Sequence, residues 1–594
     1  MFRCTVWALA VVAAVACSGD HQPTSPPSTP SFALHPCSVT GTLQLASAAA
    51  SRVDCGNGGT TVTLAGDGAS YLIVPQFATS LVPSSFVSYR LVASAATASA
   101  ATASATATSL PSSSAALDPM RGLLRATPRV AQLAFDGALR ARARAAVARG
   151  TWLSGARMST RKLAGAVGAM AVIPAPSVGS IRSFRVLADS TGRRFKSVNA
   201  RLAFAGDNVL IYVDTLSPAN GFTAAQIQSF GTLFDHTLYP IDTGAFGPPS
   251  DVDQNGRVIM LMSPAVNALT PSSECDTQGF VAGFFEEEDL GGAANDPNSN
   301  NGEIFYSIVP DPNGTASCSH TADDVGFAVP ATFLHELQHL ISFSQHFVVH
   351  GGDPEYGWLD EGLSIVAEEL GSVYYEQKCP GTACRTEPAQ LFPDSSQGFI
   401  AGFLFDSYAY ALKPDTASVT LHSDADDGFS WRGGDWLLAR WLGDQFGVSV
   451  YRHLDENGAI GVANIESVTG QSFPSLFSDF GIALFADSLP GLPRATAPAR
   501  DRFVTRNVRQ LWARLFATSG GSPDVPRAFP IPVSTIGTDT TATQRMYPGA
   551  MGFFRLNTPA NVSSVSVQFA GPGGSPLSSS LKPQLAIFRL PAGQ

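Results

Sequence analysis

Two histidines and a glutamate within one short segment place the strongest constraint on the fold of this chain. The segment is ATFLHELQHLISF, residues 331–343, and it holds His335, Glu336 and His339 in a chain with only ten histidines. Four residues span about one helical turn, so the two imidazoles project from the same face of a helix. Two imidazoles at this spacing suit zinc, and the glutamate beside them can act on a metal-bound water. The segment therefore predicts a helix that carries part of a metal site.

The rest of the segment fits a buried helix. Its apolar residues would cover one face of that helix, and they are Phe333, Leu334, Leu337, Leu340 and Ile341. Pro330 suits the first turn, where its missing N–H is not needed. An alternative without metal is a core helix whose histidines are satisfied by hydrogen bonds, with Glu336 present by chance. Because histidine is scarce here, a chance match to His-Glu-x-x-His has a probability below roughly one per cent.

A catalytic zinc ion needs a third protein ligand and an open position for water. The sequence offers three candidates for that ligand, namely His346, His350 and Glu361. His346 comes one residue too late for the three-histidine metallopeptidase motif, and Ser342 stands where that motif has glycine. His350 falls in the expected loop HFVVHGGDPEYG. Glu361 lies in EYGWLDEGLSIVAEELGS, which predicts a second helix.

Taken together, HELQHLISFSQ and WLDEGLSIVAEEL resemble the gluzincin peptidases, whose third zinc ligand is a glutamate on the next helix. Among these, the chain most resembles the hyicolysin-like neutral metallopeptidases, a secreted bacterial family. The resemblance is strongest over residues 330–371 and extends more loosely over 185–490. It implies an α+β, zincin-like catalytic domain with a mixed sheet, an active-site helix and a helical half. It also implies a cleft against an edge strand near GEIFYSIV, residues 302–309, to which an extended peptide can add.

The same resemblance implies a role for each residue of the motif. It implies that His335, His339 and Glu361 bind zinc and that Glu336 is the general base. The function that follows is an exported zinc-dependent endopeptidase acting on protein or peptide substrates. Two alternatives stay open, a catalytically inactive surface-binding lipoprotein with a peptidase-like domain and a zinc hydrolase that acts on a non-peptide bond.

One position departs from the thermolysin-type pattern, which places an aspartate four residues after the third ligand to orient a histidine. Here that position is Ile365, so the orienting group differs. Glu368 lies two helical turns after Glu361 on the same face and is our candidate, although a solvated helix charge explains it equally well. Such a reaction also needs a second oxyanion donor. The candidates for that donor are Tyr356, Tyr408, His422 and His453.

A second candidate metal site precedes the apolar run GRVIMLMS. The turn DVDQNG places Asp251, Asp253 and Asn255 at alternating positions, as at the start of a calcium loop. An EF-hand would have glutamate at its twelfth position, which here is Met262, so the segment is not an EF-hand. A polar turn before a strand explains the pattern without calcium, and we favour it. For the acidic run EEED, residues 286–289, we likewise favour a solvated charge run over a site for calcium or a basic substrate.

The first residues have the features of an export signal. Residues 1–17 contain Arg3, a short apolar run and small residues before Cys17. The run AVAC resembles a bacterial lipoprotein box, which implies that Cys17 carries lipid; an ordinary signal peptide is the alternative. Residues 18–32 are rich in proline, serine and threonine and predict an extended tether. The expected location is therefore extracellular or on the cell surface of a bacterium, with the lipid as the only membrane contact.

Cysteine count and charge agree with that location. Apart from Cys4 and Cys17, six cysteines remain, an even number that suggests disulfides in an oxidising compartment. Pairing of nearest neighbours would join Cys37 with Cys55, Cys275 with Cys318, and Cys379 with Cys384. The net charge of −11 argues against nucleic acid and against an anionic membrane surface as partners.

The rest of the chain divides by composition. Residues 33–96 and 505–594 are rich in strand-forming and turn residues, so they predict N-terminal and C-terminal all-β modules that flank a catalytic domain over 182–504. Residues 97–181 combine a low-complexity linker with the arginine-rich, helix-forming segment RVAQLAFDGALRARARAAVARG. Two interpretations of that helix stay open, a pro-segment that lies against an acidic domain and a solvated tether helix.

Overall fold

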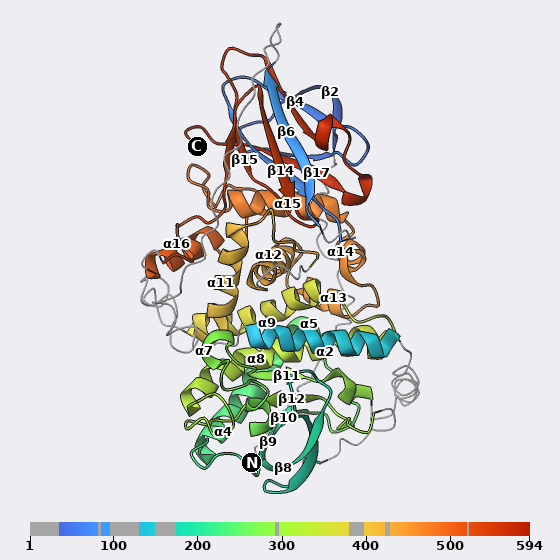
Figure 1. Cartoon of the computed structure of the whole chain (residues 1–594), viewed down its shortest axis with the longest axis vertical. Coiled ribbons are helices and arrows are strands. Elements are labelled where there is room, and N and C mark those ends of the chain that lie inside the picture. The colour runs from blue at the N-terminus through green and yellow to red at the C-terminus, as the bar shows by residue number, and fades with distance from the viewer. Residues whose placement is uncertain are drawn as a thin grey trace, which may run out of the picture.

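The structure is a computed structural model that describes residues 35–80, 85–95, 130–148, 174–291, 296–378, 397–421, 428–519 and 522–594. These residues form a mixed α/β structure with three sheets. Helices lie between the sheet that contains β7 to β12 and the other two sheets (Figure 1). The predicted signal over 1–17 with Cys17, the tether over 18–32 and the Cys379–Cys384 pair lie outside the described residues. Within those residues, no helix has the length and apolar character needed to cross a membrane.

One six-stranded sheet belongs to the part of the molecule that carries the candidate site. Its strand order is β11 (Gly283–Phe285), β12 (Ile304–Ser307), β10 (Val258–Met262), β9 (Val209–Asp214), β8 (Phe195–Ala205) and β7 (Ile181–Leu187). β10 runs parallel to β9 and β12, and the other neighbouring pairs are antiparallel. All residues of β10 are buried, as expected of a central strand covered on both faces.

β11 is the edge of this mixed sheet, and β12 lies one strand further in. Gly283, Phe284 and Phe285 pair with residues 305–307 of β12 and cover that edge. The edge therefore lies next to the predicted segment 302–309 and not in it. Three residues are too few to display the alternating pattern of a strand, so the sequence does not reveal β11.

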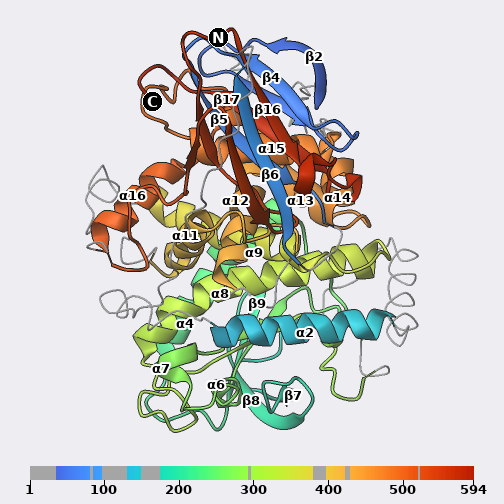
Figure 2. The same cartoon turned by 45° about the horizontal axis from the view of Figure 1, so that its top comes forward.

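Helices α8 and α9 lie side by side between the mixed sheet and the other helices (Figures 1 and 2). α8 spans Ala322–Phe343, and α9 spans Gly357–Lys378. The hydroxyl of Thr321 accepts a hydrogen bond from the backbone N–H of Asp324, and the carboxylate of Asp324 accepts one from the backbone N–H of Thr321. This capping box starts α8 at Ala322. Pro330 therefore lies inside the helix, and its prediction as a first-turn residue is wrong.

Further helices complete this part of the molecule. They are α4 (Ala224–Leu233), α5 (Tyr239–Phe246), α11 (Gln397–Leu412), α12 (Phe429–Phe446), α13 (Ser449–Asp455), α14 (Gly461–Thr469), α15 (Phe473–Ala486) and α16 (Val508–Thr518). Trp436 and Trp441 of α12 are fully buried in their core. The indole N–H of Trp512 donates to the hydroxyl of Ser407 at 3.1 Å, so α16 belongs to this helical part, although it falls in the predicted module 505–594.

The opposite end of the molecule is a β domain with two sheets. One sheet has the order β1, β3, β17, β5, β15, β13, and the other has the order β14, β6, β16, β4, β2. The strands that precede the candidate site in the chain are β1 (His35–Pro36), β2 (Ser38–Leu43), β3 (Ala50–Asp54), β4 (Thr61–Ala65), β5 (Ser70–Phe77) and β6 (Val87–Ala95). The strands after it are β13 (Ser534–Ile536), β14 (Thr540–Met546), β15 (Phe554–Asn557), β16 (Ser564–Ala570) and β17 (Pro583–Arg589).

The two predicted β modules are therefore one domain with one core. β17 lies between β3 and β5, and β16 lies between β4 and β6. The rings of Phe77 and Tyr89 contact the ring of Phe569 at centroid distances of 6.0 and 5.4 Å. Composition does not reveal this arrangement, because pairing between segments roughly 500 residues apart leaves no local pattern.

Two disulfides lie within the described residues. Cys37 is bonded to Cys55 in the β domain, and Cys275 is bonded to Cys318 in the part that carries the candidate site. They confirm two of the three predicted pairs. Each closes a loop and restricts the unfolded chain, which typically stabilises a protein by about 2–4 kcal/mol.

Candidate metal centre

α8 and the N-terminal part of α9 bring three side chains of metal-binding types to one point. His335 and His339 come from successive turns of α8, and Glu361 comes from α9. The Nε2 atoms of the histidines are 3.1 Å apart, and each lies 3.6 Å from a carboxylate oxygen of Glu361. Ligands bonded to zinc at about 2.0–2.1 Å in a tetrahedron lie about 3.3 Å from one another. The three buried donors therefore have the spacing of three corners of a zinc site.

A carboxylate lies behind each imidazole. Oε1 of Glu368 is 2.8 Å from Nδ1 of His335, and Oδ2 of Asp360 is 2.9 Å from Nδ1 of His339. An Nδ1–H that donates to a carboxylate leaves the lone pair of Nε2 free. Each ring is therefore oriented with Nδ1 toward a carboxylate and Nε2 toward the other two donors. Ile365, at the position of the thermolysin-type aspartate, packs in the apolar core.

Of these two carboxylates, the sequence singles out Glu368 and misses Asp360. Asp360 directly precedes Glu361 in the chain. Neighbouring residues on a helix point about 100° apart, so the adjacent pair can serve different atoms of one site. An acidic pair at the start of the second helix is therefore the signal that would have identified Asp360.

Two arginines contact the carboxylate of Glu361. They are Arg140 of α2 (Val130–Ala148) and Arg432 of α12, and each forms an ion pair with one carboxylate oxygen. Burial alone would raise the pKa of Glu361, but the two guanidinium groups outweigh it and hold that pKa well below its usual range. Glu361 is therefore ionised, as a metal ligand must be. Sequence reasoning missed both arginines, because they come from elements distant in the chain.

The pKa values of the two histidines shift in opposite directions. Burial lowers the pKa of His335 and so favours its neutral form. Burial also acts to lower the pKa of His339, but the carboxylates of Asp360 and Glu361 together outweigh it and raise that pKa well above its usual value. A metal that binds to Nε2 of His339 must therefore displace a proton.

Glu336 connects α8 to the edge strand. Its Oε2 accepts a hydrogen bond of 3.1 Å from the backbone N–H of Phe285, the last residue of β11. Its Oε1 has no hydrogen-bond partner within the described part of the chain, although the residue is only 4% exposed. Burial, and then the neighbouring carboxylate of Asp136, raise the pKa of Glu336 well above its usual range. The backbone of Phe285 thus fixes Oε2, whereas Oε1 can still accept a hydrogen bond.

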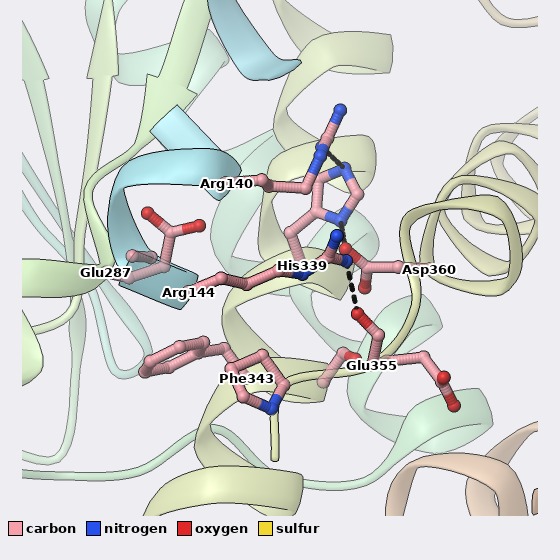
Figure 3. Close-up of a pocket in the computed structure, with 10 residues that line it drawn as sticks. Arg140, Arg144, Glu287, His339, Phe343, Glu355 and Asp360 are labelled. Atoms are coloured by element: carbon pink, nitrogen blue, oxygen red, sulfur yellow. Dashed lines mark hydrogen bonds and ion pairs between the residues drawn. The ribbon is translucent and has the colours of Figure 1, made fainter. Parts of the chain in front are cut away.

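α2 forms one wall of the space around these side chains. A pocket lined by Arg140, His339 and Asp360 opens between α2, α8 and α9 (Figure 3). Figure 3 shows Arg140 reaching His339 from α2, with Asp360 on the other side of the same imidazole. A second pocket beside it is lined by Asp136 and Glu336, and Arg140 and His339 line this one as well.

The other histidines considered as third ligands do not join the three donors. His346 is buried, and its Nε2 lies 3.8 Å from a carboxylate oxygen of Glu355. His350 is exposed at the end of the segment that follows α8. Among the described residues, the group that includes the two motif histidines is completed by Glu361.

The candidates for a second oxyanion donor lie on separate elements. Tyr408 on α11 donates its hydroxyl to the backbone carbonyl of Arg527, so this donor is already used. Tyr356 precedes α9 and is 51% exposed, and His453 lies on α13. His422 lies outside the described residues.

The acidic run 286–289 is largely buried, so its prediction as a solvated charge run is wrong. It follows β11 and leads into a short 3₁₀ helix, Glu287–Gly291. Glu286 forms an ion pair with Arg142 of α2, and Asp289 accepts a hydrogen bond from the hydroxyl of Tyr306. Protein donors therefore take the place of water around these carboxylates.

The candidate calcium turn gains a third acidic residue. Asp251, Asp253 and Glu303 each bring a carboxylate oxygen within 4.8 Å of the others. The side-chain amide of Asn255 donates to Asp253 at 2.6 Å, so Asn255 supports the turn. Met262 lies in the buried strand β10. A local motif does not include Glu303, because this residue follows the turn by about 50 residues.

Part of this chain is similar to a metalloprotease. It is 27% identical over 195 residues to the protein described as "Neutral metalloprotease ShpI" of Staphylococcus hyicus. The match covers 32% of this chain and 40% of that relative, so the chain spans less than half of the relative's length. No family model matches the chain. A metalloprotease relative is consistent with the cluster of metal-binding side chains on α8 and α9.

Proposed function

We propose that this protein is an exported zinc-dependent endopeptidase. His335, His339 and Glu361 bind the zinc in a zincin-like domain formed by the mixed sheet and the helices, and Glu336 is the general base. The observation that carries the proposal is the set of three donors 3.1–3.6 Å apart, with both imidazoles held at Nδ1. The similarity of part of the chain to a neutral metalloprotease supports peptide bonds as the target.

Each residue of the centre has a separate role in the proposed reaction. Zinc supplies a Lewis acid that lowers the pKa of a bound water and polarises the scissile carbonyl. Glu336 takes a proton from the attacking water with its free Oε1 and passes it to the leaving amine. The N–H of Phe285 holds Oε2, which fixes the direction of the base. Asp360 and Glu368 keep the imidazoles in the metal-binding tautomer.

β11 offers a surface for the backbone of the substrate. It is the edge of the mixed sheet, and its last residue contacts the general base. An extended peptide that adds to this edge by backbone hydrogen bonds would pass Glu336 and the metal centre. Recognition through the backbone suits a peptidase that cleaves extended segments of proteins.

The proposal includes export and a lipid anchor at Cys17. The two disulfides support an oxidising compartment. Radiolabelled palmitate supplied to expressing bacteria should enter the wild-type protein and not the Cys17→Ser variant. Equal labelling of the two proteins would remove the anchor from the proposal.

The test of the function combines zinc content with digestion of a peptide library, before and after limited proteolysis of the full chain. Both the wild type and Glu336→Gln should bind one zinc, and the variant should lose about 10²–10⁴ in kcat. Glu274→Gln, which alters an exposed glutamate, is the matched control and should stay active.

Three results would redirect the proposal. Full activity in Glu336→Gln would remove the general base. Zinc binding without any proteolysis would favour a hydrolase of another bond. Absence of zinc binding would favour an inactive surface-binding lipoprotein.

A further inference from the structure

We propose that α2 is a built-in inhibitor of the candidate active site and that the chain is latent until α2 is displaced. This inference rests on the proposed function and concerns the regulation of the same site. α2, drawn in cyan, lies across the junction between the mixed sheet and helices α8 and α9 (Figures 1 and 2). Its contacts with the metal donors, the edge strand and the acidic rim of the site carry the inference.

Arg140 places a positive charge among the metal donors. Its Nη1 is 3.1 Å from Nε2 of His339, and its Nη2 forms an ion pair with Oε1 of Glu361. Nε2 and the carboxylate oxygens are the atoms that converge on the candidate zinc position. A guanidinium group stays charged at any physiological pH. Arg140 therefore competes with a divalent cation for the same atoms.

Gln132 occupies the backbone of the sheet edge. Its Nε2 donates to the carbonyl of Gly283 at 2.8 Å, and its Oε1 accepts from the N–H of Ala282 at 2.8 Å. A side-chain amide has the same donor and acceptor as a peptide group. Gln132 thus occupies one backbone donor and one backbone acceptor at the start of the edge strand. The ring of Phe135 packs against Phe284 of β11 at 5.1 Å and extends this contact.

Two further arginines attach α2 to acidic and carbonyl groups beside the site. Arg142 forms ion pairs with Glu286 and, at 3.3 Å, with Glu288. Arg144 donates to the backbone carbonyl of Glu355 at 2.6 Å. The helix therefore bridges the end of the edge strand and the segment before α9. These contacts favour the pro-segment interpretation of the arginine-rich helix over a solvated tether.

With α2 in place, a substrate has no access to the site. The four central residues are at most 6% exposed, and they are His335, Glu336, His339 and Glu361. Only one face of α2 is buried, through Gln132, Phe135, Asp136, Leu139, Ala143 and Ala146. A single helix of this length is marginally stable in water, so α2 depends on these contacts to stay folded.

The test is the combined variant Arg140→Ala/Gln132→Ala in the full chain, with circular dichroism to verify the fold. Removal of the competing charge should tighten zinc binding by about tenfold or more. With zinc supplied, hydrolysis of the peptide library should rise by a similar factor. Arg452→Ala is the matched control, because it removes a 46% exposed arginine of α13 whose ion-pair partner is Glu456. The control should leave both quantities unchanged.

Two outcomes separate this inference from the proposed function. Equal zinc affinity in the double variant and the wild type would overturn the inference and would make α2 a permanent part of the fold. Tighter zinc binding without hydrolysis of any peptide would support α2 as a competitor for the metal donors and would count against the peptidase.

An independent observation carries a second inference, that Asp251, Asp253 and Glu303 bind a calcium ion. Glu303 is 1% exposed, and its Oε1 accepts from the hydroxyl of Ser250 at 2.7 Å and from the N–H of Val252 at 3.0 Å. Its Oε2 is buried and has no hydrogen-bond partner in the described part of the chain. A buried carboxylate oxygen without a donor is costly unless a cation lies beside it.

The chemistry of this set selects the metal. The three donors are carboxylates with no imidazole or thiolate among them, which favours a hard cation over zinc. Asp251 and Asp253 belong to the turn before β10, and Glu303 precedes its neighbour β12. A bound calcium ion would therefore link the ends of two neighbouring strands of the mixed sheet.

Calorimetric titration with Ca²⁺ alone tests this second site in the full chain. We expect one calcium ion per chain, a higher midpoint of thermal unfolding with calcium, and at least tenfold weaker binding in Glu303→Gln. Glu274→Gln, at an exposed position, should bind like the wild type. Absence of binding, or equal binding in Glu303→Gln and the wild type, would overturn the inference.

Discussion

Two buried clusters of charged side chains differ in whether they need a further positive charge. The interdomain cluster joins the β domain to the helices, and it consists of Arg52, Asp479, Arg500 and Asp501. The metal-centre cluster lies between α2, α8, α9 and α12, and it consists of Arg140, Arg432, Glu361, His335 and His339. Both clusters are almost fully buried, so burial does not distinguish them.

The interdomain cluster is balanced in charge by its own side chains. Its two arginines balance its two aspartates in charge. Asp479 contacts Arg52 and lies 2.7 Å from Nε of Arg500, and Asp501 lies 3.5 Å from Arg52. Each carboxylate therefore has a permanent cation beside it, as in a purely structural network.

The metal-centre cluster is complete only with a cation. The Nε2 atoms of His335 and His339 lie 3.1 Å apart, and both Nδ1 atoms already face carboxylates. Two converging imidazole nitrogens and a carboxylate need a positive charge between them, and Arg140 now provides one. In this comparison the convergence of two imidazole nitrogens and a carboxylate on one point, and not burial or ion pairing, distinguishes the candidate metal centre.

The largest expected effect is on stability and concerns the interdomain cluster. Asp479→Ala leaves Arg52 and Arg500 buried without their shared partner and should lower the free energy of unfolding by about 3–5 kcal/mol. The zinc affinity of the folded fraction should not change. Urea denaturation with a parallel zinc titration measures both quantities, and a matching loss of zinc affinity would mean that the clusters are coupled.

The next largest effect is on zinc affinity and concerns the carboxylates behind the two imidazoles. Asp360→Asn and Glu368→Gln weaken the acceptors behind the imidazoles and should each reduce zinc affinity by about 10–100-fold. Glu376→Gln is the control on the same helix, because Glu376 pairs with Arg506 and not with a histidine. If the control lost as much affinity as the two variants, the carboxylates would act through the helix and not through the rings.

The smallest effect concerns pH. The carboxylate of Asp360 raises the pKa of His339, so the metal-free site holds a proton that zinc must displace. Zinc affinity should therefore rise with pH, by up to about tenfold per unit below that pKa. In Asp360→Asn the pKa of His339 falls, and the rise should end at a lower pH. Zinc titrations from pH 5.5 to 8.5 measure the shift, and identical profiles would contradict it.

Local spacing explains what the sequence reveals about this site. The i, i+4 spacing of His335 and His339 fixes their common face on α8, and the next predicted helix brings Glu361 to them. Asp360 and Arg140 are not evident in advance, because their roles depend on how α9 and α2 pack on α8.

The same limit applies to the fold. Alternating patterns predict β-rich segments on both sides of residues 182–504, and strands are found there. That β16 lies between β4 and β6 depends on pairing across roughly 500 residues, which no local pattern encodes. The buried run 286–289 is a similar case, because its partners Arg142 and Tyr306 come from other elements.

The central claim is that His335, His339 and Glu361 hold zinc. X-ray absorption at the zinc edge of the loaded protein tests it most directly. We predict nitrogen and oxygen ligands at about 2.0–2.1 Å with the scattering of two imidazole rings, falling to one ring in His339→Ala. A coordination shell without imidazole, with sulfur at about 2.3 Å, or unchanged in His339→Ala would contradict the claim.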